Sequence, residues 1–132
     1  MVLVDTNVIV DIWDRDPKWA AWSVQQLTKL HRIQPLCINI IVYAELSRFY
    51  STSADLDRNI AALKLGVEYI PRDAAFLAGK AFLQYRKQGG TKNSILADFF
   101  IGGHAEASGS PLITRDTKRY ATYFPSVRLI AP

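Results

Sequence analysis

Short apolar runs alternate with longer amphipathic stretches along the whole chain. The short runs are rich in β-branched residues, which is typical of buried strands, and they cover residues 2–4, 36–40, 67–70, 111–114 and 127–130. The longer stretches have helical spacing, and they cover residues 7–14, 18–32, 41–50, 55–65, 73–88 and 95–108. Apolar strands that are each followed by a helix indicate a parallel sheet with helices on both faces. The pattern therefore predicts an α/β protein, a three-layer α/β/α sandwich around a parallel sheet of four to five strands, formed by one domain over residues 1–132.

Side chains at the ends of these stretches predict where helices begin and end. Ser53 and Ser94 precede helical stretches and are predicted N-caps. Gly66 and Gly109 follow helical stretches and are predicted to terminate them.

Composition narrows the class of protein. Of the 132 residues, 49% are hydrophobic and 21% are charged, a balance typical of folded globular proteins. No apolar run approaches the ~20 residues that cross a bilayer, and the first residues lack the basic segment of a signal peptide. The one cysteine, Cys37, excludes an intrachain disulfide and a multi-cysteine zinc site, and is predicted to be a buried hydrophobe. We therefore expect a cytoplasmic domain that does not bind membranes.

The positive charge is concentrated in the second half of the chain. The formal net charge is +4, from 16 basic and 12 acidic residues. Residues 1–66 hold 7 of each, whereas residues 67–132 hold 9 basic and 5 acidic residues. Such an excess suits a polyanionic partner such as a nucleic acid, although an ordinary solvated surface also carries it.

Four acidic residues fall near predicted strand ends and helix starts. Asp5 directly follows the first strand, and Asp116 lies two residues past the fourth. Glu45 lies in the helix after the second strand, and Asp98 lies near the start of the last long helix. Because the crevice of a parallel sheet lies beyond the carboxyl ends of its strands, we expect these acids to converge. Close carboxylates repel one another unless a hard cation neutralises them, so Mg²⁺ or Mn²⁺ is the candidate ligand.

Each acid also has an ordinary structural role open to it. Asp5 can cap the following helix, and Glu45 can pair with Arg48 three residues on. Asp98 can be an acid favoured by the helix dipole, and Asp116 can open a turn. The apolar neighbours of Asp98 favour convergence, because burying an unpaired carboxylate is costly.

The chain lacks the residues and motifs that zinc sites, serine hydrolases and nucleotide-binding sites need. His31 and His104 lie far apart in sequence, and the chain has no HExxH or C-x-x-C motif for zinc. It also has no G-x-S-x-G, Walker or G-x-G-x-x-G motif. The pair Gly102 and Gly103 is predicted to permit close helix packing, and His104 to lie on a helix face.

In order and spacing, four segments of the chain resemble the PIN-domain family: MVLVDTNVIVDI, YAEL, SILADFFIGGHA and LITRDTKRYATYFPSVRLIAP. The chain length and the closing segment resemble VapC-type toxins of toxin–antitoxin pairs. The resemblance implies RNA cleavage, a cognate antitoxin as partner and a homodimer. It also implies that Asp5, Glu45, Asp98 and Asp116 are catalytic and bind Mg²⁺ or Mn²⁺. The family often carries a small hydroxyl residue three positions before the glutamate, where this chain has Val42.

Further residues are expected to support this chemistry. Asn7 and Thr114 are predicted to orient a carboxylate or a water, although helix capping by Asn7 and ordinary strand composition at Thr114 are equally open. The implied reaction is attack by a metal-activated water on an RNA phosphodiester bond. Bases of the second half are predicted to line the RNA path, namely Arg86, Lys87, Lys92, Arg115, Lys118 and Arg119.

Three other functions remain as alternatives. A catalytically silent nucleic-acid or protein-binding module is compatible with the same fold. A haloacid-dehalogenase-type phosphatase needs a second aspartate two residues after Asp5, where this chain has Asn7. A receiver-like signalling domain needs paired acids at the end of the first strand, where only Asp5 is present.

Overall fold

The computed structural model describes all 132 residues and has a central sheet of five strands in the order β3-β2-β1-β4-β5. The strands are β1 (Val2–Val4), β2 (Leu36–Asn39), β3 (Leu65–Glu68), β4 (Leu112–Ile113) and β5 (Leu129–Ile130). Every neighbouring pair is parallel. The central strand β1 is fully buried, as expected for a strand with neighbours on both edges and helices on both faces.

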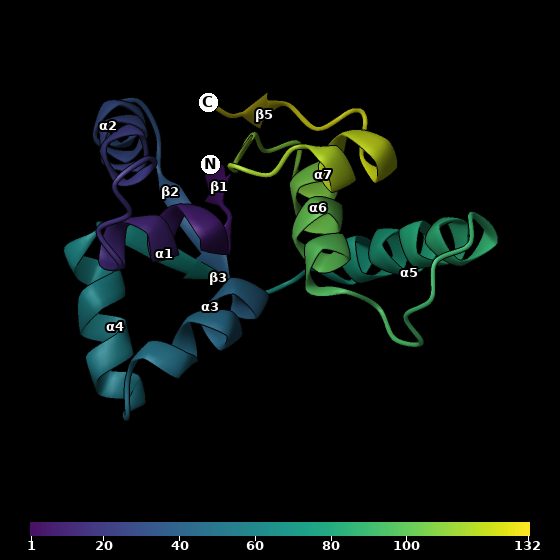
Figure 1. The fold of residues 1–132 in the computed structure, drawn as a ribbon, viewed down its shortest axis with the longest axis horizontal. Coiled ribbons are helices and arrows are strands. Elements are labelled where there is room, and N and C mark those ends of the chain that lie inside the picture. Colours follow the sequence, from purple (N-terminus) through teal and green to yellow (C-terminus); the bar gives the residue numbers. More distant parts are fainter.

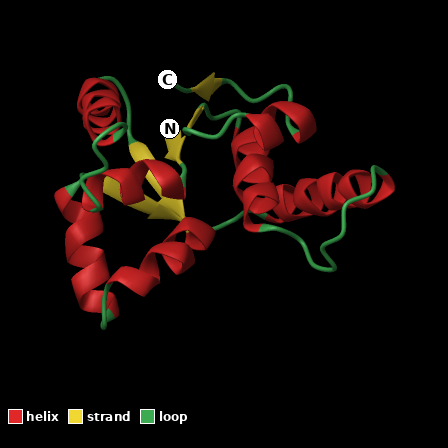
Figure 2. Ribbon diagram, viewed as in Figure 1, coloured by secondary structure: helices red, strands yellow, loops and turns green.

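Helices cover the sheet on both sides. They are α1 (Thr6–Trp13), α2 (Ala20–His31), α3 (Ile40–Leu46), α4 (Ser53–Ala62), α5 (Arg72–Lys87), α6 (Ala97–Ser108) and α7 (Lys118–Tyr123). Figure 1 shows α1, α2 and α4 on one side of the strands and α5, α6 and α7 on the other, and Figure 2 shows the strands between the two groups. The predicted three-layer α/β/α sandwich is confirmed. None of these helices combines the length and apolar character needed to span a membrane.

Two glycines allow the helices of the second layer to pack closely. A Cβ on Gly103 would lie 2.6 Å from the carbonyl oxygen of Ala74, so α6 and α5 touch backbone to backbone there. A Cβ on Gly102 would lie 2.3 Å from the Phe124 ring. The prediction that this pair permits close helix packing is confirmed. The close packing fixes the position of α6, the helix that carries Asp98.

Several predicted helix ends were wrong. Thr52, rather than Ser53, caps α4, because its hydroxyl accepts a hydrogen bond from the Asp55 amide. That helix ends at Ala62, and Gly66 lies in β3.

The beginning of α6 and the whole of α7 also differ from the prediction. α6 begins at Ala97 rather than next to Ser94, because the backbone of Leu96 is extended and lies outside the helix. Arg86 donates to the carbonyls of Gly90 and Lys92 in the preceding loop. The six-residue α7 was not predicted, since a stretch that short shows little helical periodicity. Gly109 ends α6 as predicted, with a φ of 62°.

Candidate active site

The four acidic residues singled out from the sequence line one cleft at the carboxyl ends of β1 and β4. The cleft has a volume of about 320 Å³, and Asp5, Glu45, Asp98 and Asp116 all contribute to its wall. Asp5 follows β1, Glu45 lies in α3, Asp98 lies in the first turn of α6, and Asp116 follows β4. Four separate elements of the fold thus bring carboxylates to one place.

Asp5 is the most tightly held of the four, with only 5% of its surface exposed. Its Oδ1 accepts a hydrogen bond from the Thr6 amide at 2.8 Å, so it also begins α1. Its Oδ2 accepts from the Thr114 hydroxyl at 2.8 Å and from the Tyr120 hydroxyl at 3.0 Å. The side-chain amide of Asn7 donates to the same oxygen at 3.3 Å. Asn7 and Thr114 therefore both contact a carboxylate of the cleft.

The electrostatics of the cleft favour a neutralising cation. Burial raises the pKa of Asp5 from 3.8 to about 6, against the hydrogen bond from Thr114, and the charge of Asp98 adds to the rise. Burial also raises the pKa of Asp98, and the nearby Glu45 and Asp116 raise it further. Only Arg119 opposes that rise appreciably as a charge. The carboxylates are thus close enough to repel one another.

Glu45 is held by the residue that follows Asp5. The Thr6 hydroxyl donates to Glu45 Oε1 at 2.7 Å, and Glu45 makes no ion pair with Arg48. Val42, which lacks a hydroxyl, is buried in the core. The hydroxyl that supports this glutamate therefore comes from Thr6 on α1.

The buried side-chain amide of Asn39 fixes the start of α3, the helix that carries Glu45. Asn39 Oδ1 accepts from the amides of Ile41 and Val42 at 3.0 Å and so caps α3. The Asn39 Nδ2 lies 3.3 Å from His104 Nδ1. Burial lowers the pKa of His104, so the neutral ring is favoured and its Nδ1 can accept this hydrogen bond. His104 thus links α6 to the start of α3 and stays away from the cleft wall.

Asp98 and Asp116 lie nearer to solvent. Asp98 Oδ2 is 3.5 Å from Arg119 Nη1, and both side chains are 36% exposed. The Arg119 guanidinium also lies over the rings of Tyr85 and Phe99, at 5.9 and 5.7 Å from their centroids. Asp116 is exposed and accepts from the Lys118 amide at 3.3 Å, so it opens a turn as well as lining the cleft.

Arg115 is anchored beside the carboxylates. Its Nε and Nη2 donate to Asp11 at 2.7 and 3.1 Å, and Asp11 is only 4% exposed. The guanidinium lies 5.8 Å from the centroid of the Trp19 ring. The Arg115 amide donates to Asn7 Oδ1 at 3.1 Å. The positively charged guanidinium of Arg115 is therefore held in the wall of the cleft, with part of its surface open to solvent.

The other predicted RNA-contacting bases differ in their freedom to bind. Lys87, Lys92 and Lys118 are exposed. Arg86 is exposed too, but its guanidinium is engaged with the carbonyls of the loop that precedes α6.

The donors of the cleft fit a hard divalent cation. No nitrogen or sulfur ligand lines the cleft, and its acids supply carboxylate oxygens. No three of the His, Cys, Asp and Glu side chains stand close enough to share one ion directly. Mg²⁺ is commonly held by one or two carboxylates, with water in its remaining positions. The cleft therefore suits an ion bound directly by one or two carboxylates and through water by the others.

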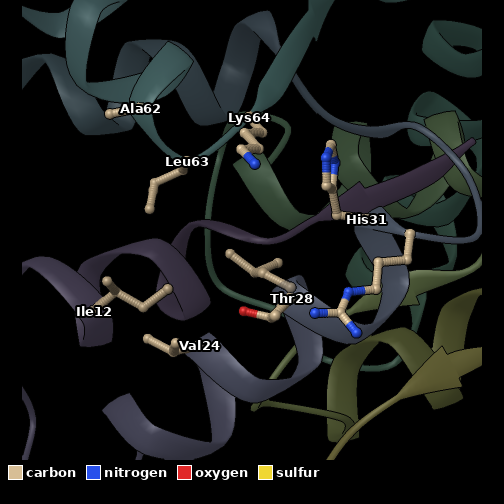
Figure 3. Close-up of a pocket in the computed structure, with 9 residues that line it drawn as sticks. Ile12, Val24, Thr28, His31, Ala62, Leu63 and Lys64 are labelled. Atoms are coloured by element: carbon tan, nitrogen blue, oxygen red, sulfur yellow. The ribbon is translucent and has the colours of Figure 1, made fainter.

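A second cavity shows no comparable chemistry. It has a volume of about 270 Å³ and lies between α1, α2 and the end of α4 (Figure 3). Ile12 and Val24 lie on one side of it, and Lys64 and His31 on the other. Its lining contains no carboxylate.

The sequence argument missed three polar residues of the acidic cleft and one that supports it from behind. Thr6 was present in the quoted Asp-Thr-Asn segment, and its position next to Asp5 was the available indication. Tyr120 lies in the short helix that the pattern did not predict. Arg48 lines the cleft, and Asp11 anchors Arg115 from the buried face of α1. For these two, only the fold reveals the role.

Comparisons with known proteins identify the family and support the fold. The family model of the PIN domain matches residues 2–125. VapC ribonuclease Y4jK from Sinorhizobium fredii is 30% identical, in a match that covers 91% of this chain and 90% of that protein. A chain in the crystal structure of VapBC2 from Rickettsia felis, bound to a DNA fragment from their promoter, has a TM-score of 0.75 at 20% identity, covering 99% of this chain and 98% of that one. A chain of VapBC-1 from nontypeable Haemophilus influenzae has a TM-score of 0.73 at 22% identity, with the same coverage. The two structures support the fold.

Proposed function

This chain belongs to the PIN-domain family, and from that premise we propose that it is a metal-dependent endoribonuclease, the toxin of a toxin–antitoxin pair. The observation that carries the proposal is the meeting of four carboxylates from four elements in one cleft. The burial of Asp5 and the mutual repulsion of the carboxylates are costly for the fold alone. A site that binds a divalent cation and cleaves phosphodiester bonds accounts for that cost.

Asp5 and Asp98 are the proposed direct ligands of Mg²⁺ or Mn²⁺, and Asp116 and Glu45 are proposed to act through water. When bound, the ion supplies a water of lowered pKa and a Lewis acid for the scissile phosphate. Thr6 keeps Glu45 Oε1 engaged, which leaves the second carboxylate oxygen to accept a hydrogen bond from a water in the cleft. No side chain acts as a covalent nucleophile in this scheme.

Basic side chains of the protein are proposed to bind the RNA backbone. Arg115 and Arg48 line the same cleft as the carboxylates and suit contacts with the phosphate groups next to the scissile bond. Lys87, Lys92 and Lys118 are exposed and extend the positive surface. Neutral substitution of Lys118 by Gln is expected to reduce the slope of log affinity against log salt by about 0.7 for single-stranded RNA. Lys29→Gln, on the exposed part of α2, is the matched control, and equal slopes in the two variants would argue against this path.

The proposed partners follow from the relatives. Two of the matched structures are of VapBC proteins, and a third relative is described as a toxin–antitoxin complex from Klebsiella pneumoniae. We therefore propose a cognate antitoxin as partner. The family resemblance of the sequence is the basis on which we also propose a homodimer of this chain. Expression of the wild-type chain without an antitoxin is expected to arrest growth of a bacterial host, and expression of Asp98→Asn to leave growth normal. Growth arrest by both proteins, or by neither, would argue against a toxic nuclease.

The decisive test is cleavage of structured RNA by purified protein. Cleavage is expected with Mg²⁺ or Mn²⁺, and it should stop in excess EDTA and in the Asp98→Asn variant. Asp73→Asn, which removes an exposed acid from the first turn of α5, is the matched control and should cleave normally. Undiminished cleavage in EDTA would refute the metal dependence. RNA binding without cleavage under all metal conditions would instead favour the catalytically silent module.

A further inference from the structure

A core aromatic residue places its only polar atom among the carboxylates. Tyr120 is 1% exposed and is one of the largest buried side chains of the chain. Its hydroxyl lies 3.0 Å from Asp5 Oδ2 and 3.5 Å from Asp98 Oδ1. The residue therefore ties the short helix α7 to the end of the central strand, 115 positions away in sequence.

The hydrogen bonds of Asp5 are distributed unequally between its two oxygens. Oδ2 has three donors within reach, from Thr114, Tyr120 and Asn7, whereas Oδ1 accepts only from the Thr6 amide. A carboxylate oxygen offers about two lone-pair directions. Oδ2 is therefore saturated by the protein, and Oδ1 keeps one direction free.

We propose that Tyr120 is a positioning residue of the metal site: its hydroxyl holds Asp5 Oδ2 against the protein interior and so presents Oδ1 to a divalent cation. This inference rests on the proposed function to the extent that the cleft binds such a cation. The other donors hold Asp5 from Thr114, which directly follows β4, and from α1. Tyr120 alone among them also approaches Asp98, and thereby sets the spacing of the two proposed direct ligands.

The surroundings of the phenol keep its hydroxyl protonated. Burial and the neighbouring charges of Asp5 and Asp98 raise the pKa of Tyr120 well above its usual value. The hydroxyl therefore stays protonated and can only donate to an ionised carboxylate. Donation to a charged acceptor makes a stronger hydrogen bond than donation to a neutral one.

The test replaces Tyr120 by Phe, which keeps the buried ring and removes one oxygen. Tyr123→Phe is the matched control, because it lies in the same helix and its hydroxyl bonds to Gln88 outside the cleft. Binding of Mn²⁺ to the metal-free proteins is measured by titration calorimetry at pH 7.5. Loss of an outer hydrogen-bond partner typically weakens metal binding about 10- to 100-fold, and we expect a loss in that range for Tyr120→Phe. The control should bind like wild type.

A second measurement separates positioning from a role in packing. RNA cleavage by Tyr120→Phe is followed as Mn²⁺ is raised, and its rate should approach the wild-type rate once the weaker site is filled. Wild-type metal affinity in Tyr120→Phe, with or without a lower melting temperature, would overturn the positioning role and leave the proposed function intact. A failure of wild type itself to bind Mn²⁺ would overturn both. A rate that stays low at saturating Mn²⁺ would also overturn the positioning role.

Discussion

Replacing Asp5 by Asn should change how the stability of the metal-free protein depends on pH. Asp5 is almost fully buried, and its pKa rises from 3.8 to about 6 on folding. This difference corresponds to about 3 kcal/mol by which the charged form destabilises the folded state. The folded protein binds this proton more tightly than the unfolded chain, so stability should fall as pH rises from about 4 to about 7. Asn keeps the size of the side chain and removes the titration.

The measurement is urea denaturation of both proteins in EDTA at several pH values between 4 and 8, analysed by linear extrapolation. The difference between the two curves isolates the Asp5 proton together with its repulsion by Asp98. Relative to Asp5→Asn, the wild type should lose about 2.4 kcal/mol between pH 4 and pH 7, because the unfolded carboxyl is already partly ionised at pH 4. Above pH 7 the difference should be constant, because Asp5 is then charged in both the folded and the unfolded state.

Two outcomes would refute this reasoning. A difference between the curves that is independent of pH would mean that burial does not perturb Asp5. A wild type that gains stability relative to the variant as pH rises would mean that the hydrogen bonds from Thr114, Tyr120 and Thr6 outweigh desolvation. The absolute offset between the curves is less informative, because Asn has one acceptor oxygen where Asp5 offers two to its hydrogen-bond donors.

Two further changes test the cleft and the packing behind it. Asp98→Asn should leave metal-free stability unchanged or higher, because it removes a repelled charge and an exposed ion pair of about 0–1 kcal/mol. It should also reduce the rise in melting temperature on adding Mg²⁺, and equal rises in both proteins would contradict its role as a ligand. Gly103→Ala should cost about 1–3 kcal/mol in thermal or urea denaturation, because its Cβ would lie 2.6 Å from a backbone oxygen of α5. Gly79→Ala, where a Cβ meets nothing within 4 Å, should instead stabilise by about 0.5–1 kcal/mol, and a Gly103→Ala protein as stable as wild type would contradict the packing argument.

The sequence by itself determined the fold class and the location of the cleft. Buried parallel strands are covered on both faces, so all their side chains must be apolar. Such continuous apolar runs can be recognised in the sequence without any structure. Asp5 follows such a run directly and Asp116 lies two residues past another, and the geometry of parallel sheets brings strand ends together. Family resemblance then indicated the chemistry, and the fold and the family were confirmed.

Only the tertiary structure decided how the carboxylates are held. Thr6 reaches Glu45 across 39 positions, and Tyr120 reaches Asp5 across 115, and no local pattern encodes contacts of that separation. The start of α6 also differs from the prediction, because the backbone of Leu96 is extended and the helix begins only at Ala97. The spacing of apolar residues indicates which face of a helix or strand is buried, because whether a position is apolar depends on its own burial and not on which residue it contacts. The partner that a buried polar atom meets depends on how distant elements pack, and that information belongs to the fold.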